Sequence, residues 1–242
     1  MADLLSVVSS RAVRDRPGGT DVRAAFLGHC APSLPQVLAS LDGAPAVVVP
    51  LLLTAAYHSK ADIPAQLAAA GAGLDVVSAA PLGPHPLLLA ALERRLREAG
   101  VPADDPRARA STGVVLAAAG SSDPAANATI ARLAARWQRE RGWLAVAPAY
   151  ASAAGPRPAD AVLALRAQGV RRVAVATYLL APGRFADKIR EACAAAGAGT
   201  VSEALGPAPE VADLVLARYA EAADVPMCSS PVVAVSGRPG PA

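Results

Sequence analysis

The sequence predicts an α/β protein built from two similar halves, each a three-layer α/β/α arrangement around a parallel sheet, related by a pseudo-two-fold axis. The chain has 242 residues, enough for two domains of about 110–120 residues each. Hydrophobic residues make up 53% of it and charged residues 18%, which excludes global disorder. Short β-branched runs alternate with Ala/Leu-rich stretches of helical length, the pattern of βαβ units.

An internal repeat defines the two halves. Leu82-Gly83-Pro84-His85-Pro86 recurs as Leu205-Gly206-Pro207-Ala208-Pro209, 123 residues further on. Two apolar runs repeat at similar offsets, residues 47–53 with 174–180 and residues 22–26 with 146–150. Repetition over so many elements predicts two copies of one supersecondary plan.

The elements follow from apolar runs and their flanking turn residues. In the first half we expect strands at 22–28, 46–53 and 75–79, and helices at 2–14, 33–42, 60–71 and 86–98. In the second half we expect strands at 113–119, 144–150, 171–179 and 200–204, and helices at 125–141, 158–168, 186–196 and 209–222. These elements give an N-terminal domain over residues 1–100 and a C-terminal domain over residues 113–223.

The remaining segments lack periodicity. Gly100–Thr112 is polar and contains prolines, so we expect a linker. Residues 224–242 hold four prolines and no periodic pattern, so we expect a disordered tail.

The first half is one strand short. The second half opens with a strand at Gly113–Ala119 and a Gly-Ser-Ser-Asp-Pro turn, whereas an offset of 124 pairs Met1 with Ala125, just past that turn. Either the chain starts late or the half has lost its central strand. A lost central strand would expose two strand edges to water, so we favour the late start.

Composition excludes several classes of function. The net charge is +3 and no basic run is interleaved with aromatic residues, which argues against nucleic acid. No apolar stretch reaches the roughly 18–20 residues of a membrane span, and the N-terminus does not read as a secretory signal. No nucleotide-binding glycine motif occurs, and the 3 cysteines are too widely spaced for an iron–sulfur cluster. We therefore expect a cytoplasmic protein, monomeric, that uses no nucleotide and no membrane.

The 3 histidines all lie in the first half. His29, His58 and His85 each follow a predicted strand, at the carboxyl edge where open α/β sheets place ligand sites. The repeat has Ala153, Phe185 and Ala208 at these positions, so the scaffold itself does not require histidine. Imidazoles converging on one crevice suit a divalent metal with open coordination positions. The alternative is that they are ordinary surface residues, most plausibly for His85 at a helix start.

Two neighbouring features leave alternatives open. Asp62, four residues after His58, either orients the imidazole or caps the helix that begins near Pro64. The turn at residues 120–124 either binds an anion through its amides or is an N-cap turn, with Ser122 or Asp123 as the cap. Its serines lack a G-x-S-x-G context, which argues against nucleophilic catalysis.

Three segments together resemble a known family. Residues 119–124 with Asn127 resemble a degenerate A-H-G-S-R-D-P…N motif, and Leu51–Pro64 resembles an apolar strand, a loop histidine and Asp-Ile-Pro. Phe26–Pro35 is similar to an A-F-L-E-x-x-x-P-S-L segment. In this order the chain, over residues 1–222, resembles the CbiX/SirB sirohydrochlorin chelatases in their long bacterial form, in which two chelatase-like halves enclose one tetrapyrrole cleft.

The resemblance implies a lyase that inserts Fe²⁺ or Co²⁺ into sirohydrochlorin, for sirohaem or cobalamin synthesis. Of the two metal-binding histidines of the family, the loop histidine corresponds to His58, while the first would fall before Met1 and is Ala119 in the second half. His29 stands next to Gly28, which replaces the family glutamate, and is assigned to the same metal and catalytic site.

The substrate is implied to contact both halves. Tyr57 and Phe185 are expected to pack against the macrocycle, and Arg184 and Ser121 to bind its carboxylates. Phe185 at the position of His58 indicates a degenerate second half. A non-catalytic tetrapyrrole- or metal-binding protein is the competing interpretation. A periplasmic-type sugar-binding fold is disfavoured because aromatic residues are few.

Overall fold

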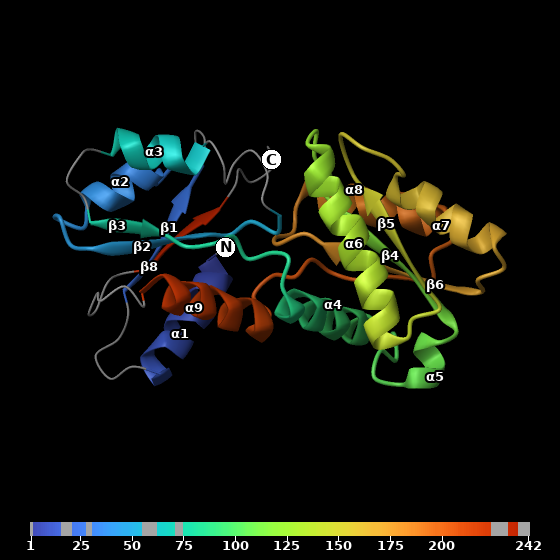
Figure 1. The fold of residues 1–242 in the computed structure, drawn as a ribbon. Helices are drawn as coiled ribbons and strands as arrows, with labels where there is room; N and C mark the ends of the chain where they lie inside the picture. Colours follow the sequence, from blue (N-terminus) through green and yellow to red (C-terminus); the bar gives the residue numbers. More distant parts are fainter. Residues whose placement is uncertain are drawn as a thin grey trace. The chain divides into compact units, whose positions relative to one another are not determined.

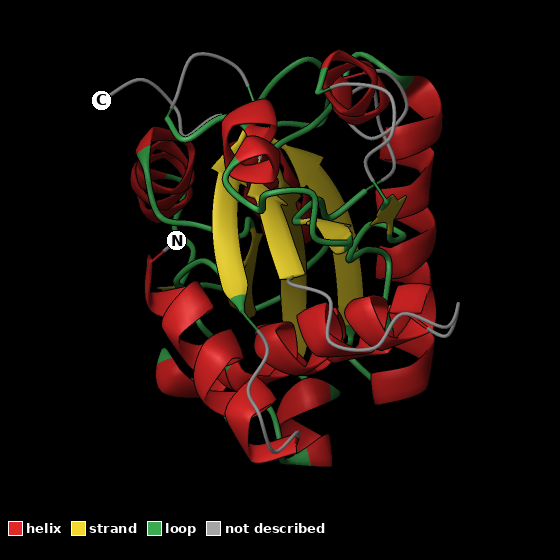
Figure 2. Ribbon diagram, turned by 90° about the vertical axis from the view of Figure 1, so that its left-hand side faces the viewer, coloured by secondary structure: helices red, strands yellow, loops and turns green. Residues whose placement is uncertain are grey.

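The protein folds into two compact units, seen in the computed structural model in Figure 1. The structure describes residues 2–15, 21–27, 31–54, 62–70, 75–223 and 232–236. The described residues of the first unit lie within Met1–Gly83 and Pro207–Pro239, and those of the second within Pro84–Gly206. Each unit is a four-stranded parallel sheet with helices on both faces (Figure 2). The predicted α/β class is confirmed.

The first unit has strand order β1-β8-β2-β3. Its strands are β1 (Val22–Phe26), β2 (Ala46–Pro50), β3 (Val76–Ser78) and β8 (Val232–Ser236). Its helices are α1 (Ala2–Asp15), α2 (Leu34–Ala39), α3 (Ile63–Ala69) and α9 (Pro209–Ala223). Helices α2 and α3 share one buried cluster with the sheet, and α1 packs against α9 on the strands.

The central strand of the first unit comes from the far end of the sequence. Residues 1–100 supply three strands, as expected, and β8 lies between two of them, parallel to both. Val232 pairs with Val22 of β1 and with Val47 of β2. The expected disordered tail therefore contains a buried strand. The gap between β1 and β2 is thus filled by a segment from elsewhere in the chain.

The second unit has strand order β5-β4-β6-β7. Its strands are β4 (Thr112–Ala118), β5 (Ala145–Tyr150), β6 (Arg172–Tyr178) and β7 (Thr200–Val201). Its helices are α4 (Pro86–Glu98), α5 (Pro106–Arg109), α6 (Pro124–Arg141), α7 (Pro158–Ala167) and α8 (Arg184–Ala195). Short α5 lies within the segment expected to be a linker, where Asp105 caps it by accepting a hydrogen bond from the Arg107 N–H (2.9 Å).

The two halves exchange their last helices, so the units differ from the expected domains of residues 1–100 and 113–223. Helix α4, in the first half of the sequence, packs on β6 of the second unit. Helix α9, in the second half, packs on β2 of the first unit. The chain therefore crosses between units at the two copies of the repeated Leu-Gly-Pro-x-Pro motif.

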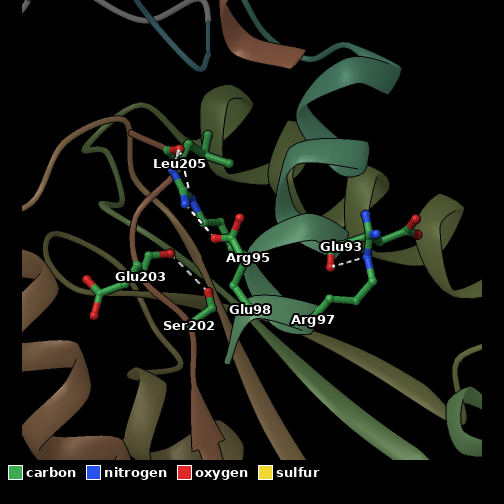
Figure 3. A network of polar contacts seen from close by, with 7 residues as sticks. All are labelled: Glu93, Arg95, Arg97, Glu98, Ser202, Glu203 and Leu205. Atoms are coloured by element: carbon green, nitrogen blue, oxygen red, sulfur yellow. Dashed lines mark hydrogen bonds and ion pairs between the residues drawn. The ribbon is translucent and has the colours of Figure 1, made fainter. Parts of the chain in front are cut away.

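Equivalent arginines hold the two crossing segments to these helices. Arg95 of α4 donates from Nε and Nη2 to the carbonyl oxygen of Leu205, at 3.1 and 2.8 Å, as Figure 3 shows. Arg218 of α9 donates from Nε to the carbonyl oxygen of Pro81 (2.9 Å). Each arginine also pairs with a glutamate three residues later, Glu98 or Glu221. The same device thus recurs 123 residues apart.

Candidate functional site

The carboxyl edge of the first sheet is where the histidine-bearing loops begin. One residue beyond β1, the N–H of Leu27 donates to the carbonyl oxygen of Ser236 (3.0 Å). One residue beyond β2, the N–H of Leu51 donates to the carbonyl oxygen of Val235 (2.7 Å). Both loops therefore leave the sheet from points that are anchored to the same strand, β8.

The residues predicted to bind the metal lie past these points. His29, Tyr57 and His58 are outside the described residues, so their predicted roles remain predictions. Beyond the second loop, Asp62 occupies the N-cap position of α3 without a side-chain hydrogen bond to the helix amides. The structure therefore places Asp62 at the cap position, and its predicted role toward His58 stays a prediction, because His58 lies outside the described residues.

His85 has a structural task in the second unit. It is the N-cap residue of α4, and its Nδ1 accepts a hydrogen bond from the N–H of Leu87 (3.2 Å). An acceptor at this position satisfies one of the free amides of the first helical turn. This capping role accounts for a histidine at position 85 without a metal.

The serine turn at the carboxyl end of β4 is held mainly by its own side chains. The N–H of Ser121 donates to Oδ1 of Asn127 (3.0 Å), and Nδ2 of Asn127 donates back to the Ser121 carbonyl (2.7 Å). Ser121 Oγ accepts from the N–H of Asp123 (3.1 Å), and Asp123 caps α6 by accepting from the N–H of Ala125 (2.9 Å). Two of the turn's amides and one in the first turn of α6 are thus already bonded, which favours the N-cap interpretation over an anion cradle.

Close packing of this turn requires glycine at position 120. Gly120 has a φ of +85°, and a Cβ there would lie 2.1 Å from the carbonyl oxygen of Ser152. The Ser152 N–H and Oγ both donate to the carbonyl oxygen of Ala119, at 2.8 and 2.9 Å. Any side chain at 120 would separate the β4 and β5 loops.

Arg184 and Phe185 open α8 at the carboxyl end of β6. Because β6 is paired in parallel with β4, with Tyr178 beside Ala118, both residues leave the same edge of the sheet as Ser121. Phe185 is 43% exposed, one of the large hydrophobic side chains that remain accessible. An exposed aromatic ring beside an arginine is suited to a flat, acidic ligand.

Burial raises the pKa of two tyrosines and one cysteine in the second unit. Burial raises the pKa of Tyr150, whose hydroxyl donates to the Asn127 carbonyl (2.8 Å), and raises the pKa of Tyr178 beyond the range in which it ionises. Burial likewise raises the pKa of the Cys193 thiol to about 11. Among the described residues no group of three or more His, Cys, Asp and Glu side chains is placed to hold a metal.

The strand that anchors both histidine loops was missed by sequence reasoning. Its signal was the apolar run Val-Val-Ala-Val after Pro231. Proline cannot donate to a ladder, and four prolines in this part of the chain hid the run.

Sequence comparisons place the chain among known proteins. The family described as CbiX matches residues 6–99 and 113–222. A sirohydrochlorin cobaltochelatase from Priestia megaterium is 28% identical over 152 residues, which cover 60% of this chain and 48% of the relative. A sirohydrochlorin ferrochelatase from Bacillus subtilis (strain 168) is 29% identical over 145 residues, 59% of this chain and 53% of the relative. The matched segment thus spans about half the length of these relatives.

Solved structures agree in fold. SirB from Bacillus subtilis, solved with Fe³⁺, superposes with a TM-score of 0.74 at 24% identity, covering 95% of this chain and 94% of that one. SirB from Bacillus subtilis subspecies spizizenii in complex with cobalt gives 0.71 at 22% identity, covering 93% and 89%. No described helix is long and apolar enough to span a membrane. The two matched segments cover most of both halves, and the chain belongs to the CbiX family.

Proposed function

We propose that this protein is a sirohydrochlorin chelatase, a lyase whose substrates are sirohydrochlorin and Fe²⁺ or Co²⁺. Its family membership and the names of its relatives support this activity. The observation that carries the proposal is the shared anchoring of Leu27 and Leu51 on β8. Loops that begin at neighbouring points of one sheet edge are suited to bring His29 and His58 to a common ion.

Each proposed site residue has a distinct task. His58, with His29, binds the incoming metal, and neutral imidazole accepts the two protons that leave the pyrrole nitrogens. Tyr57 and Phe185 pack against the macrocycle. Arg184 and Ser121 bind its carboxylates, the former through charge-assisted hydrogen bonds and the latter through its hydroxyl. The protein acts as a cytoplasmic monomer and uses no nucleotide. Light scattering at the working concentration measures its molecular mass and tests whether it is a monomer.

Metal insertion into sirohydrochlorin, followed by its visible spectrum without oxygen, tests the site. His58→Ala is expected to abolish insertion, because Phe185 and Ala119 at the equivalent positions of the repeat cannot bind metal. The matched control is His85→Asn, which keeps an N-cap acceptor on α4 and is expected to retain insertion. Unchanged insertion by His58→Ala would refute the site.

A second candidate is a non-catalytic carrier of the tetrapyrrole or the metal. In sheet register, Ser236 beside Phe26 corresponds to Ala118 beside Tyr150. The next residue of the second unit, where the family motif has its first histidine, is Ala119, and the residue after Ser236 in the first unit lies outside the described residues. Saturable sirohydrochlorin binding without insertion of either metal by the unmodified chain would favour the carrier.

A further inference from the structure

The slot between β1 and β2 holds β8, an extended segment whose two partner strands lie near the opposite end of the sequence. Five residues of β8 pair with β1 and four pair with β2, all in parallel. Val232, Val233 and Val235 are fully buried and Ala234 is 1% exposed. Among the described strands of this sheet, only β8 has two partner strands that both lie far from it in sequence.

Both faces of the segment contribute to the core. Val233 and Val235 belong to the buried cluster that includes Leu34 and Leu38 of α2 and Ile63 of α3. Because side chains alternate along a strand, Val232 and Ala234 are buried on the opposite face of the sheet. The slot therefore selects its occupant by a run of small and β-branched residues as well as by backbone hydrogen bonds.

The sheet cannot close without this occupant. β1 and β2 pair with β8 and not with each other. Without β8, both would present unpaired N–H and C=O groups to the gap, and buried backbone groups without partners are strongly disfavoured.

Helix α9, which precedes the segment in sequence, is held to the same unit. Helix α9 is fastened there by the ion pair of Asp213 with Arg11 and by the hydrogen bond from Arg218 to Pro81. Residues 224–231, between α9 and β8, are few, and a short tether from a fixed point gives the segment a high effective concentration at the slot. These contacts favour the chain's own segment over that of a second copy.

We propose that the slot is a binding site for an extended, parallel, apolar strand, with residues 232–236 of the same chain as a separable ligand that completes the first unit when it docks. This inference goes beyond the proposed function, and its tests read out structure and binding rather than metal insertion.

The test cuts the tether and leaves the folded chain otherwise intact. A protease recognition sequence is placed between residues 224 and 231 of the full chain and cleaved under native conditions. The C-terminal fragment is expected to co-elute with the rest and to keep the amides of β1 and β2 protected from hydrogen exchange. Release of the fragment with β1 and β2 still protected would overturn the proposal.

Exchange of the fragment tests whether the slot is a site. A fluorescent peptide of residues 230–238 is expected to replace the fragment, with a saturable rise in anisotropy. The same peptide with Val233→Asp and Val235→Asp is expected to bind more than about 100-fold more weakly, because both carboxylates would be buried without partners. Failure of the unmodified peptide to bind after the fragment is removed would refute a separable strand.

Two further measurements use the uncut protein. Val233→Asp is expected to remove protection from β1 and β2 but not from β4 and β6. The matched control, Val115→Asp at the equivalent position of β4, is expected to do the reverse. Protection of the first unit in Val233→Asp would contradict the proposal. A dimer, detected by exchange between differently labelled chains, would show that the slot is filled by the segment of a second copy. That result would contradict the proposal.

Discussion

The two sheets share one strand order but build their centres differently. In the second unit the central strand β4 is followed directly by α6 and β5, and it forms six register pairs with β5 and seven with β6. In the first unit the corresponding strand β8 lies near the other end of the chain and forms five pairs with β1 and four with β2. The central position of a parallel sheet is therefore defined by register and burial, whichever end of the chain supplies the strand.

This difference places the two units under different constraints. A central strand that is close in sequence to its partner strands forms its contacts over short chain separations, whereas the partners of β8, β1 and β2, lie near the opposite end of the sequence. Closing that loop costs entropy before the strand gains any contact. The first unit therefore depends on its most distant segment, and the second does not.

We expect the first unit to unfold before the second. Its central strand has four fewer register pairs than β4 and is supplied by a segment distant in sequence, so the first unit should have the lower free energy of unfolding. Both tryptophans, Trp137 and Trp143, lie in the second unit. In urea, circular dichroism should therefore change before tryptophan fluorescence. Coincident transitions would show that the units unfold together.

Trp137→Ala is expected to reverse that order. The Trp137 side chain is fully buried, packs edge-on against Trp143 at 5.9 Å between ring centroids, and donates from Nε1 to Glu93 (2.9 Å). Its loss leaves a cavity and a buried carboxylate with one partner fewer, at a cost of about 3–5 kcal/mol to the second unit. The remaining Trp143 reports the earlier transition by fluorescence.

The control for this change lies on the same helix. Arg136→Ala removes an exposed ion pair with Glu140 (2.7 Å) and is expected to cost less than about 0.5 kcal/mol. If Trp137→Ala destabilised the second unit no more than Arg136→Ala, the tryptophan pair would not be its structural centre.

Much of this architecture could be predicted from the sequence because its elements carry local signals. Helix α4 has the predicted bounds of residues 86–98, since Pro86 opens it and an apolar stripe runs its length. Strand β2 ends at Pro50 rather than at residue 53, although the apolar run continues to Leu53. Apolar character alone does not say where pairing stops.

The errors concern long-range choices that local patterns do not encode. The repeat shows that α4 corresponds to α9, but equivalence in sequence does not say which unit each helix covers. The β8 run is five residues long, too short to stand out among prolines. For the candidate site, the histidine positions follow from the sequence, whereas the hydrogen bonds of the Asn127 side chain with the Ser121 N–H and carbonyl depend on the fold of the turn.

The smallest expected effects test the exchanged helices. Arg95→Met keeps most of the apolar stem but removes both hydrogen bonds to the Leu205 carbonyl, so it should cost the second unit about 1–3 kcal/mol. Arg218→Met removes the single bond to Pro81 and should cost the first unit about 1 kcal/mol. For the first variant, the urea midpoint of the tryptophan fluorescence transition should fall. For the second variant, only the midpoint of the circular dichroism transition should fall.

A neighbouring arginine supplies the control for both substitutions. Arg97 contacts the Glu93 carbonyl at 3.4 Å and Asp104 at 3.4 Å with a side chain that is 42% exposed, so Arg97→Met should change stability by less than about 0.5 kcal/mol. If Arg95→Met instead weakened the first unit, α4 would belong with the half of the sequence that encodes it. The loss of stability should therefore be largest for Arg95→Met, smaller for Arg218→Met and smallest for the control Arg97→Met. That order would show that the exchanged helices are held by these crossing segments in solution.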